Sequence, residues 1–392
     1  MSRVLIVRGH QATPWELRPW CDLGDRFEVS YLLTRSNRFE PPAGLRPVRV
    51  HALRELMPPG ALGDAGAAVL GDRYVGVDRA FAEADIVHAE ELSYWFAADA
   101  ARAKHRHHFK LVQTIWETLP LLSAYRNRQA RRHRELVLAE TDLFLAATER
   151  AADALRLEGV EDERVMVCPP GIDVDRFAAA AAPVTRPPTP REHVIVAPGR
   201  LVWEKGHHDV LRALAALHRG IVTLADGTLA RPRLLIVGAG PEQERLRAHA
   251  LELGVAEAVE IVSVGYEQMP SVFADASAMV LASQASAGAA YHPLGIPRVF
   301  WEEQFGMVLA EAMASGLSIV TTSSGAIPEV VAGAGVDLVA AGDWIGIARA
   351  LAAGPLARAP GTRVEYPPAL VERYSARAAA ERLAGAYERV LR

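Results

Sequence analysis

The segment Val194-Ile195-Val196-Ala197-Pro198-Gly199-Arg200-Leu201-Val202-Trp203-Glu204-Lys205-Gly206 decides the fold class of this chain. Its first four residues are apolar, which is typical of a strand that is buried on both faces. A loop follows, and the composition of 207–217 favours a helix. A strand, a loop and a helix in this order form one unit of a parallel α/β sheet.

The loop of this unit carries two cations, Arg200 and Lys205, close to the expected start of the helix. Backbone N–H groups and the helix dipole favour anions at that end, so the loop fits a diphosphate. The alternative is that both side chains are solvated loop charges, and spacing alone leaves the two interpretations equal.

The same alternation of apolar runs and helix-favouring segments covers the whole chain, which predicts two Rossmann-like domains with parallel sheets. We expect the boundary in 178–191, because four prolines there oppose regular structure. The first domain is 1–180 together with a C-terminal helix at about 372–392, and the second domain is 181–371. The expected strands are 4–7, 27–33, 47–50, 86–89, 111–115, 143–147 and 165–168, then 194–197, 234–237, 259–262, 278–281, 318–321 and 336–339.

Composition excludes several classes of protein. The chain has 392 residues with 43 Lys and Arg against 47 Asp and Glu, so its net charge of −4 gives no field that recruits nucleic acid. Two cysteines, Cys21 and Cys168, cannot form a disulfide framework or a four-thiolate metal site, and they fit a reducing compartment. No apolar run approaches the ~20 residues that span a bilayer. We therefore expect a cytoplasmic protein.

The segment 301–316 combines two carboxylates with a short helix. Gly306 marks the turn into the helix and Gly316 its end. Glu303 precedes the helix, whereas Glu311 lies in it and off the apolar face, ~7 Å further along the axis. A carboxylate can accept hydrogen bonds from both hydroxyls of a ribose. Taken singly, each glutamate is also explained as an ordinary surface carboxylate near a helix.

Together these segments carry a family resemblance. The motifs occur in the order Gly199-Arg200-Leu201…Glu204-Lys205-Gly206, Val237-Gly238-Ala239-Gly240-Pro241 and Glu303-Gln304-Phe305-Gly306…Glu311-Ala312-Met313-Ala314-Ser315-Gly316, after Pro169-Pro170-Gly171-Ile172-Asp173-Val174-Asp175-Arg176-Phe177. The chain resembles the retaining glycosyltransferases of family 4. The resemblance implies the GT-B fold: two facing Rossmann-like domains, with the C-terminal helix crossing back to the first.

The resemblance also implies roles for the second domain. Arg200 and Lys205 would bind the diphosphate of a nucleoside-diphosphate sugar, and Glu311 the ribose. Glu303 would contact the transferred sugar, near the backbone amides of Phe305 and Gly306, and the nucleobase would lie at Gly265 and Tyr266. The catalytic residues would be Glu303, Arg200 and Lys205, with no metal ion and no other cofactor, since fixed cations can stabilise the departing diphosphate.

The first domain departs from the family pattern. Gly9 and His10 follow the first strand where the family often has two glycines. Trp116 stands where the family usually has a histidine, and Glu117 follows it. These four residues are candidates for the acceptor or sugar side. Trp116 could stack on a sugar or be a core aromatic, and Glu117 could accept a proton or cap a turn.

Two further segments suggest functional surfaces. Of the arginines from Arg126 to Arg134, Arg128, Arg131 and Arg132 share a helical face, which fits either contact with an anionic membrane or a solvated surface. The long connection 283–301 has the length of a lid.

These observations predict a metal-independent retaining hexosyltransferase that uses a donor of the GDP-mannose or UDP-glucose type. Its acceptor would be a small molecule, a glycan or a lipid-linked sugar, at the inner membrane face in the last case. The alternatives are a nucleotide-sugar epimerase of the same fold and a non-catalytic sugar-nucleotide-binding protein.

Overall fold

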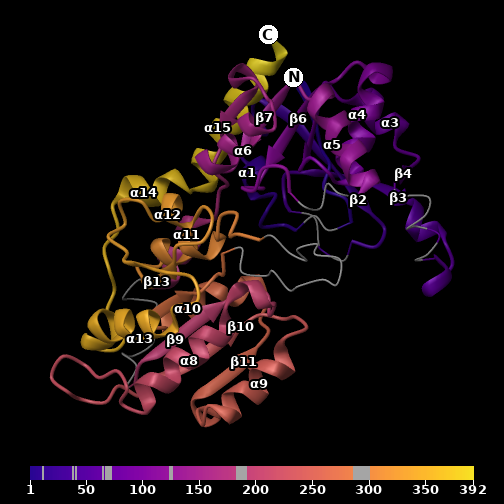
Figure 1. Ribbon diagram of the computed structural model, residues 1–392. Helices are drawn as coiled ribbons and strands as arrows, with labels where there is room; N and C mark the ends of the chain where they lie inside the picture. The colour runs from indigo at the N-terminus through magenta and orange to yellow at the C-terminus, as the bar shows by residue number, and fades with distance from the viewer. Residues whose placement is uncertain are drawn as a thin grey trace. The chain divides into compact units, whose positions relative to one another are not determined.

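The computed structural model describes residues 1–10, 13–37, 39, 42–63, 66, 73–122, 127–181, 192–285 and 301–392 (Figure 1). The chain divides into two compact units. The first unit contains residues 1–172 and 373–392, and the second contains 173–372. Each unit has its own sheet, as the alternation of apolar and helix-favouring segments predicts.

The first unit is built on an eight-stranded sheet in the order β4-β3-β2-β1-β5-β6-β7-β8. All neighbouring strands run parallel except β4, which pairs antiparallel with β3. The strands are β1 (Ser2–Ile6), β2 (Phe27–Thr34), β3 (Arg46–Ala52), β4 (Tyr74–Val75), β5 (Ile86–Glu90), β6 (Lys110–Ile115), β7 (Leu143–Ala146) and β8 (Val165–Val167). The helices are α1 (Arg18–Cys21), α3 (Asp78–Glu83), α4 (Trp95–His107), α5 (Arg128–Glu140), α6 (Glu149–Leu157) and α15 (Ala376–Leu391), with 3₁₀ turns η1 (Leu53–Leu56) and η3 (Asp162–Arg164).

The second unit has a six-stranded sheet whose paired strands all run parallel, in the order β11-β10-β9-β12-β13-β14. Its strands are β9 (Val194–Pro198), β10 (Arg233–Val237), β11 (Val259–Val262), β12 (Ala278–Leu281), β13 (Ser318–Thr322) and β14 (Leu338–Val339). The helices are α7 (Val174–Ala181), α8 (His207–His218), α9 (Gln243–Glu252), α10 (Met269–Asp275), α11 (Met307–Ala314), α12 (Ile327–Val330), α13 (Trp344–Ala353) and α14 (Pro368–Arg373). The 3₁₀ turns of this unit are η4 (Trp203–Lys205), η5 (Ala256–Ala258), η6 (Tyr266–Gln268) and η7 (Pro355–Ala357).

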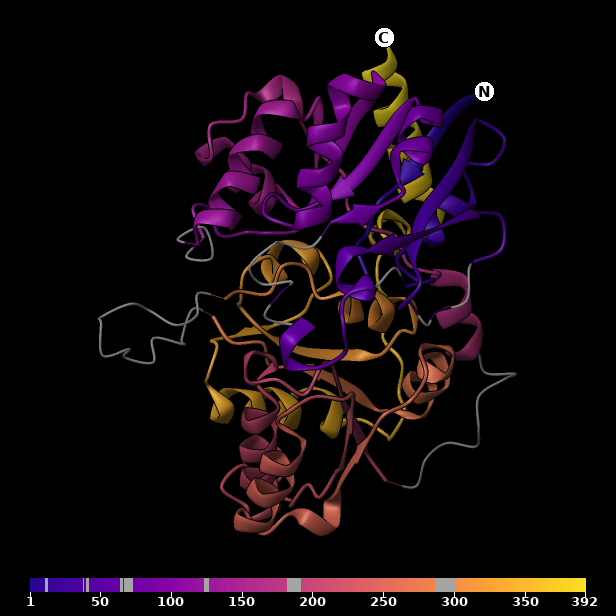
Figure 2. The same ribbon diagram turned by 90° about the vertical axis from the view of Figure 1, so that its right-hand side faces the viewer.

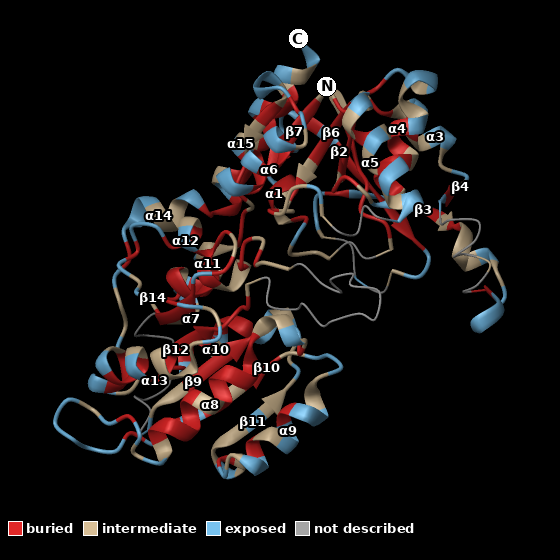
Figure 3. Cartoon of the chain, in the orientation of Figure 1, coloured by how far each residue is buried: buried red, intermediate tan, exposed pale blue. Residues whose placement is uncertain are grey.

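Burial explains why the strands were visible in the sequence. The central strands of both sheets are buried, whereas α9 and the outer faces of α4 and α5 are exposed (Figure 3). Parallel strands covered on both faces are apolar at nearly every position, so a run of Val, Ile and Leu marks them. The exception is β4, a two-residue antiparallel edge strand that the sequence analysis missed because it is too short for a pattern.

The C-terminal helix packs on the first unit, as the resemblance implied. Figure 2 shows α15 beside the strands of that unit, and the Trp20 indole donates a hydrogen bond to the Tyr387 hydroxyl at 2.7 Å. The helix begins slightly later than the expected residue 372, because α14 ends at Arg373 and the Ser375 side chain caps α15 by accepting from the Ala378 amide.

The division between the units falls earlier than the expected 180/181. It lies at 172/173, because α7 packs on α10 and α11 of the second unit. The buried Phe177 ring lies 5.7 Å from the Phe273 ring of α10. Most of the expected linker, 182–191, lies outside the described residues.

Candidate active site

Lys205 and Glu303 form a buried ion pair in the second unit. The Lys205 ammonium lies 2.6 Å from a Glu303 carboxylate oxygen, and the two side chains are 14% and 7% exposed. Lys205 ends η4, after which Gly206 adopts a left-handed conformation (φ 67°) and begins α8. A Cβ at Gly206 would lie 1.9 Å from the Ala282 carbonyl oxygen, so only glycine lets this loop pack on the end of β12.

Three groups at the ends of β12 and β13 hold Glu303 in place. The Ser283 hydroxyl donates to the Glu303 carboxylate at 2.6 Å, and the Glu303 amide donates to the Ser324 hydroxyl at 3.1 Å. The Glu303 carbonyl accepts from the Ala326 amide at 2.9 Å. Neither Ser283 nor Ser324 was a sequence-based candidate for the site, although both lie within three residues of the end of an expected strand, where ligand-binding residues of α/β sheets gather.

Arg200 differs from Lys205 in its surroundings. It is exposed, and its guanidinium forms no ion pair or hydrogen bond with any residue that the structure describes. Its backbone is anchored instead, because the His207 imidazole donates from Nε2 to the Arg200 carbonyl at 3.2 Å. Glu303 thus pairs with Lys205, whereas the Arg200 guanidinium has no carboxylate partner among the described residues.

Glu311 is buried in α11, contrary to the expectation that it lies off the packing face. It is 3% exposed and accepts a hydrogen bond from the Tyr266 hydroxyl at 3.0 Å. Burial raises the pKa of Glu311 to about 7, while the Tyr266 hydrogen bond and the Arg176 charge oppose this rise. Because α7 packs on α11, both faces of this short helix are covered. Near neutral pH this carboxyl is thus divided between its charged and neutral forms.

The other predicted donor-side positions surround these two glutamates. Phe305 is buried, and Gly306 starts α11 with φ 78°. The first amides of a helix lack intrahelical acceptors, so this end of α11 can receive an anion. Gly265 precedes η6, where Arg176 pairs with Glu267 at 2.8 Å and lies over the Tyr266 ring at 5.4 Å.

Gly9 and His10 lie at the end of β1 in the first unit. The Gly9 amide donates to the Tyr74 hydroxyl at 2.9 Å, and a Cβ at Gly9 would lie 2.7 Å from the Phe96 ring. Packing against Phe96 thus accounts for this glycine. The half-buried His10 ring lies 5.3 Å from the Trp95 ring.

Trp116 and Glu117 lie directly after β6, and both are half-buried. One Glu117 carboxylate oxygen accepts from the amides of Thr118 and Leu119, each at 2.9 Å. These contacts are those of a carboxylate that caps a turn. The Trp116 amide donates to Glu91 at 2.9 Å.

The structure places two further acids, Glu90 and Glu91, near the candidate Glu117. Glu91 is 9% exposed and has φ 61°, an uncommon conformation for a residue other than glycine. Burial, aided by the nearby charges of Glu117 and Glu90, raises its pKa to about 8. Arg8 partly compensates, with its guanidinium 3.2 Å from Glu90. Only the fold could show this group, since its members lie at the ends of two different strands, β5 and β6.

The remaining candidate segments are described in part. Arg128, Arg131 and Arg132 are exposed on α5, whereas Arg134 pairs with Glu158; Arg126 lies outside the described residues, as does 286–300 of the expected lid. Among the described residues, no three metal-ligating side chains are close enough to hold an ion, and no helix is long and apolar enough to cross a membrane.

Parts of the chain are similar in sequence to other proteins. It is 34% identical over 168 residues to the GDP-mannose-dependent alpha-(1-6)-phosphatidylinositol monomannoside mannosyltransferase of Mycolicibacterium smegmatis, covering 42% of this chain and 39% of that protein. It is 30% identical over 244 residues to the D-inositol 3-phosphate glycosyltransferase of Actinosynnema mirum, and this match covers 58% of this chain and 52% of that protein. The matches thus span about half or less of those relatives.

Solved structures match the whole chain. HepE of Anabaena, solved in complex with UDP and glucose, has a TM-score of 0.67 at 17% identity and covers 99% of this chain and 100% of its own. This similarity shows the fold. Two family models match, "Glycosyltransferase Family 4" over residues 23–176 and "Glycosyl transferases group 1" over 185–353. Together they show that the chain belongs to the family 4 glycosyltransferases, with the GT-B fold.

Proposed function

We propose that this protein is a retaining glycosyltransferase that moves a hexose from a nucleoside-diphosphate sugar to an acceptor hydroxyl without a metal ion. The observation that carries the proposal is the arrangement around α11: Glu303 is held before the helix by Lys205, and Glu311 lies buried in its second turn. Sugar, diphosphate and ribose can then be bound in this order along one helix.

The proposed donor-side chemistry is electrostatic. Breaking the bond between the anomeric carbon and oxygen leaves the electron pair on the diphosphate, whose negative charge grows in the transition state. Arg200, Lys205 and the N-terminus of α11 would stabilise that charge more strongly as it develops. Glu303 would orient the Lys205 ammonium and contact a hydroxyl of the transferred sugar.

The proposed acceptor side uses the first unit. The acceptor oxygen would attack the anomeric carbon on the face that the diphosphate leaves, and its proton would pass to the leaving phosphate oxygen. Gly9, His10, Trp116 and the acids after β5 and β6 would line the acceptor position. This assignment follows the general rule that ligands of parallel sheets bind beyond the carboxyl ends of the strands.

Donor identity is tested by offering the full chain GDP-mannose and UDP-glucose separately. Isothermal titration calorimetry measures binding of each donor, and NMR of the products measures transfer to an added acceptor, slow hydrolysis, and the anomeric configuration. We expect one donor to bind and react with retention, and EDTA to leave the rate unchanged. Reversible loss of activity in EDTA would contradict the metal-independent mechanism.

The same experiment separates the two alternatives. An epimerase of this fold would interconvert the sugar of the donor without an acceptor. A binding protein would give heat on titration but neither transfer nor hydrolysis. The first family member named above is GDP-mannose-dependent and HepE binds UDP, so both nucleotides are tested first.

We further propose a cytoplasmic location with peripheral contact to anionic lipid through α5. The cysteines at positions 21 and 168 are both free thiols, which fits a reducing compartment. Arg128, Arg131 and Arg132 expose three positive charges on one helix. Flotation with vesicles containing anionic lipid should carry the protein upward at low salt, and the triple Arg→Gln variant should stay behind. Equal flotation of both forms would exclude α5 as the contact.

A further inference from the structure

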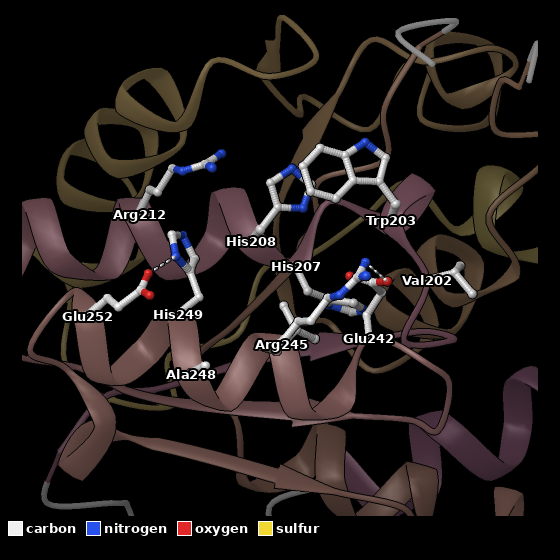
Figure 4. A pocket seen from close by; sticks show the side chains of 11 residues that line it. Val202, Trp203, His207, His208, Arg212, Glu242, Arg245, Ala248, His249 and Glu252 are labelled. Carbon is white, nitrogen blue, oxygen red and sulfur yellow. Dashed lines mark hydrogen bonds and ion pairs between the residues drawn. The ribbon is translucent and has the colours of Figure 1, made fainter. Parts of the chain in front are cut away.

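A pocket of about 310 Å³ lies between α8 and α9 of the second unit (Figure 4). This volume is at the lower end of the range for small-ligand sites. The residues that line it do not include Arg200, Lys205, Glu303 or Glu311. The pocket is therefore separate from the proposed donor site, although Trp203 and His207 in its wall flank the loop that carries Lys205.

Two buried histidine nitrogens in the pocket wall lack partners. The His207 side chain is 3% exposed, and its Nδ1 forms no hydrogen bond with the described residues. Its Nε2 carries the proton, because it donates to the Arg200 carbonyl. Burial lowers the pKa of His207 to about 4, so the ring is neutral and Nδ1 can only accept.

His249 presents a second acceptor. Its Nδ1 lies 3.6 Å from the Glu252 carboxylate, which favours the proton on that nitrogen (Figure 4). Its Nε2 is buried and has no partner within the described part of the chain. Buried polar atoms are nearly always hydrogen-bonded, so two unpartnered acceptors in one pocket indicate an occupant that donates hydrogen bonds.

The charges of the wall exclude an anion as that occupant. Arg245 pairs with Glu242 at 3.0 Å, and Arg212 pairs with Asp209 at 2.6 Å. Each guanidinium is thus neutralised by a carboxylate, and the two imidazole lone pairs would repel a further negative charge. The described residues also offer no set of three metal ligands. A neutral donor of hydrogen bonds remains.

The upper wall of the pocket is flat and aromatic. The Trp203 indole stacks on the His208 imidazole, with ring centroids 3.9 Å apart and planes at 10° to each other (Figure 4). Trp203 itself is 52% exposed. Aromatic rings combine a large apolar face with rigid geometry. Such a face beside hydrogen-bond acceptors suits a ring whose faces carry C–H groups and whose edge carries hydroxyls.

We propose that this pocket binds a neutral saccharide ring: hydroxyls donate to His207 Nδ1 and His249 Nε2, and the C–H face lies against the Trp203–His208 stack. The inference does not depend on the proposed transferase reaction. It assigns a second carbohydrate site to the donor-side unit of the chain.

Saturation-transfer NMR on the full chain, with mannose and glucose as probes and no nucleotide present, tests the proposal. A single sugar ring should bind with a Kd on the order of 1 mM. His249→Leu keeps the bulk but removes the acceptor, and Trp203→Ala removes the aromatic face; each should weaken binding at least about tenfold. Leu251→Gln, on the exposed side of the same helix, is the matched control and should bind as the unaltered chain does.

Three results would overturn the proposal: no sugar signal at about one hundred times the expected Kd, unchanged sugar binding in both pocket variants, or displacement of the sugar by inorganic phosphate. Failure of the proposed transferase function is read separately, as absence of UDP and GDP binding in calorimetry. Sugar binding that survives saturating UDP or GDP and is lost in His249→Leu supports the second site even then.

Discussion

The two units present different charges at equivalent edges of their sheets. In the second unit, Glu303 lies beside the carboxyl ends of β12 and β13, where it pairs with Lys205 at 2.6 Å. In the first unit, Glu90 ends β5, Glu91 follows it and Glu117 follows β6, and the Arg8 guanidinium lies 3.2 Å from Glu90. Burial, aided by the charges of Glu117 and Glu90, raises the pKa of Glu91 to about 8, whereas Glu303 lies against a cation. A common architecture thus supports opposite electrostatics, because the loops and not the strands carry the charges.

Among the substitutions that test this contrast, removal of Lys205 is expected to change activity and stability most. Lys205→Met leaves Glu303 buried without its cation, as in the first unit, so kcat/KM should fall about 10²–10³-fold. The free energy of unfolding should also fall by about 3–5 kcal/mol. Steady-state kinetics and urea unfolding measure the two effects, with Lys110→Met on the exposed start of β6 as the control.

The double variant Lys205→Met with Glu303→Gln separates catalysis from stability. Its unfolding free energy should recover, since no buried charge is left unpaired, while activity stays low. Recovery of activity as well would mean that the cation only stabilises the fold.

Substitution of Glu311 should have the next largest effect. Glu311→Gln loses the charged acceptor that we propose for the ribose, so the KM for the donor should rise about 10–100-fold. In the unaltered protein, the donor KM should rise as the pH falls below about 7, where the carboxyl takes up its proton. The profile of KM against pH should be flat in Glu311→Gln; a persistent inflection near 7 would assign it to another group.

Glu91 should make the folded protein less stable as the pH rises, whereas an acid paired with a cation has the opposite effect. Its folded-state pKa is raised to about 8 from the ordinary 4.5, so the folded protein holds the proton more tightly than the unfolded chain. The free energy of unfolding should therefore decrease as the pH rises from about 4.5 to 8. Glu91→Gln keeps an acceptor for the Trp116 amide and removes this loss.

The melting temperature measured between pH 5 and 9 checks the Glu91 prediction. The advantage of Glu91→Gln over the unaltered chain should grow with pH, by several degrees in total. The exposed Glu161→Gln serves as the control, since its carboxylate is 66% exposed. Parallel curves for all three proteins would show that Glu91 is charged throughout.

The smallest expected effect concerns Tyr266. Its hydroxyl donates to Glu311 and lowers the pKa of that carboxyl against the effect of burial. Tyr266→Phe should therefore move the inflection of donor KM upward by about one pH unit or less. Tyr94→Phe, an exposed tyrosine of the first unit, should leave the inflection in place. A downward shift in Tyr266→Phe would contradict the assigned direction of the hydrogen bond.

Most strands of both sheets could be predicted from the sequence, since strands buried on both faces have a recognisable apolar composition. The site was predicted as a set of residues but not as a set of contacts. Lys205 and Glu303 are far apart in the chain, and their ion pair arises only because the ends of β9, β12 and β13 meet at one edge of the sheet. The burial of Glu311 was missed for a related reason: α11 is covered by α7, whose position no local pattern records.

The sequence alone determined the α/β class, the order of the elements and the family, because short-range apolar patterns and ordered motifs encode them. The tertiary structure decided which charges meet. It paired Lys205 with Glu303, left Arg200 exposed, placed Glu91 among other acids and oriented two histidines into a pocket. Electrostatic energies depend on distance and burial, and both are fixed only when remote segments of the chain pack together.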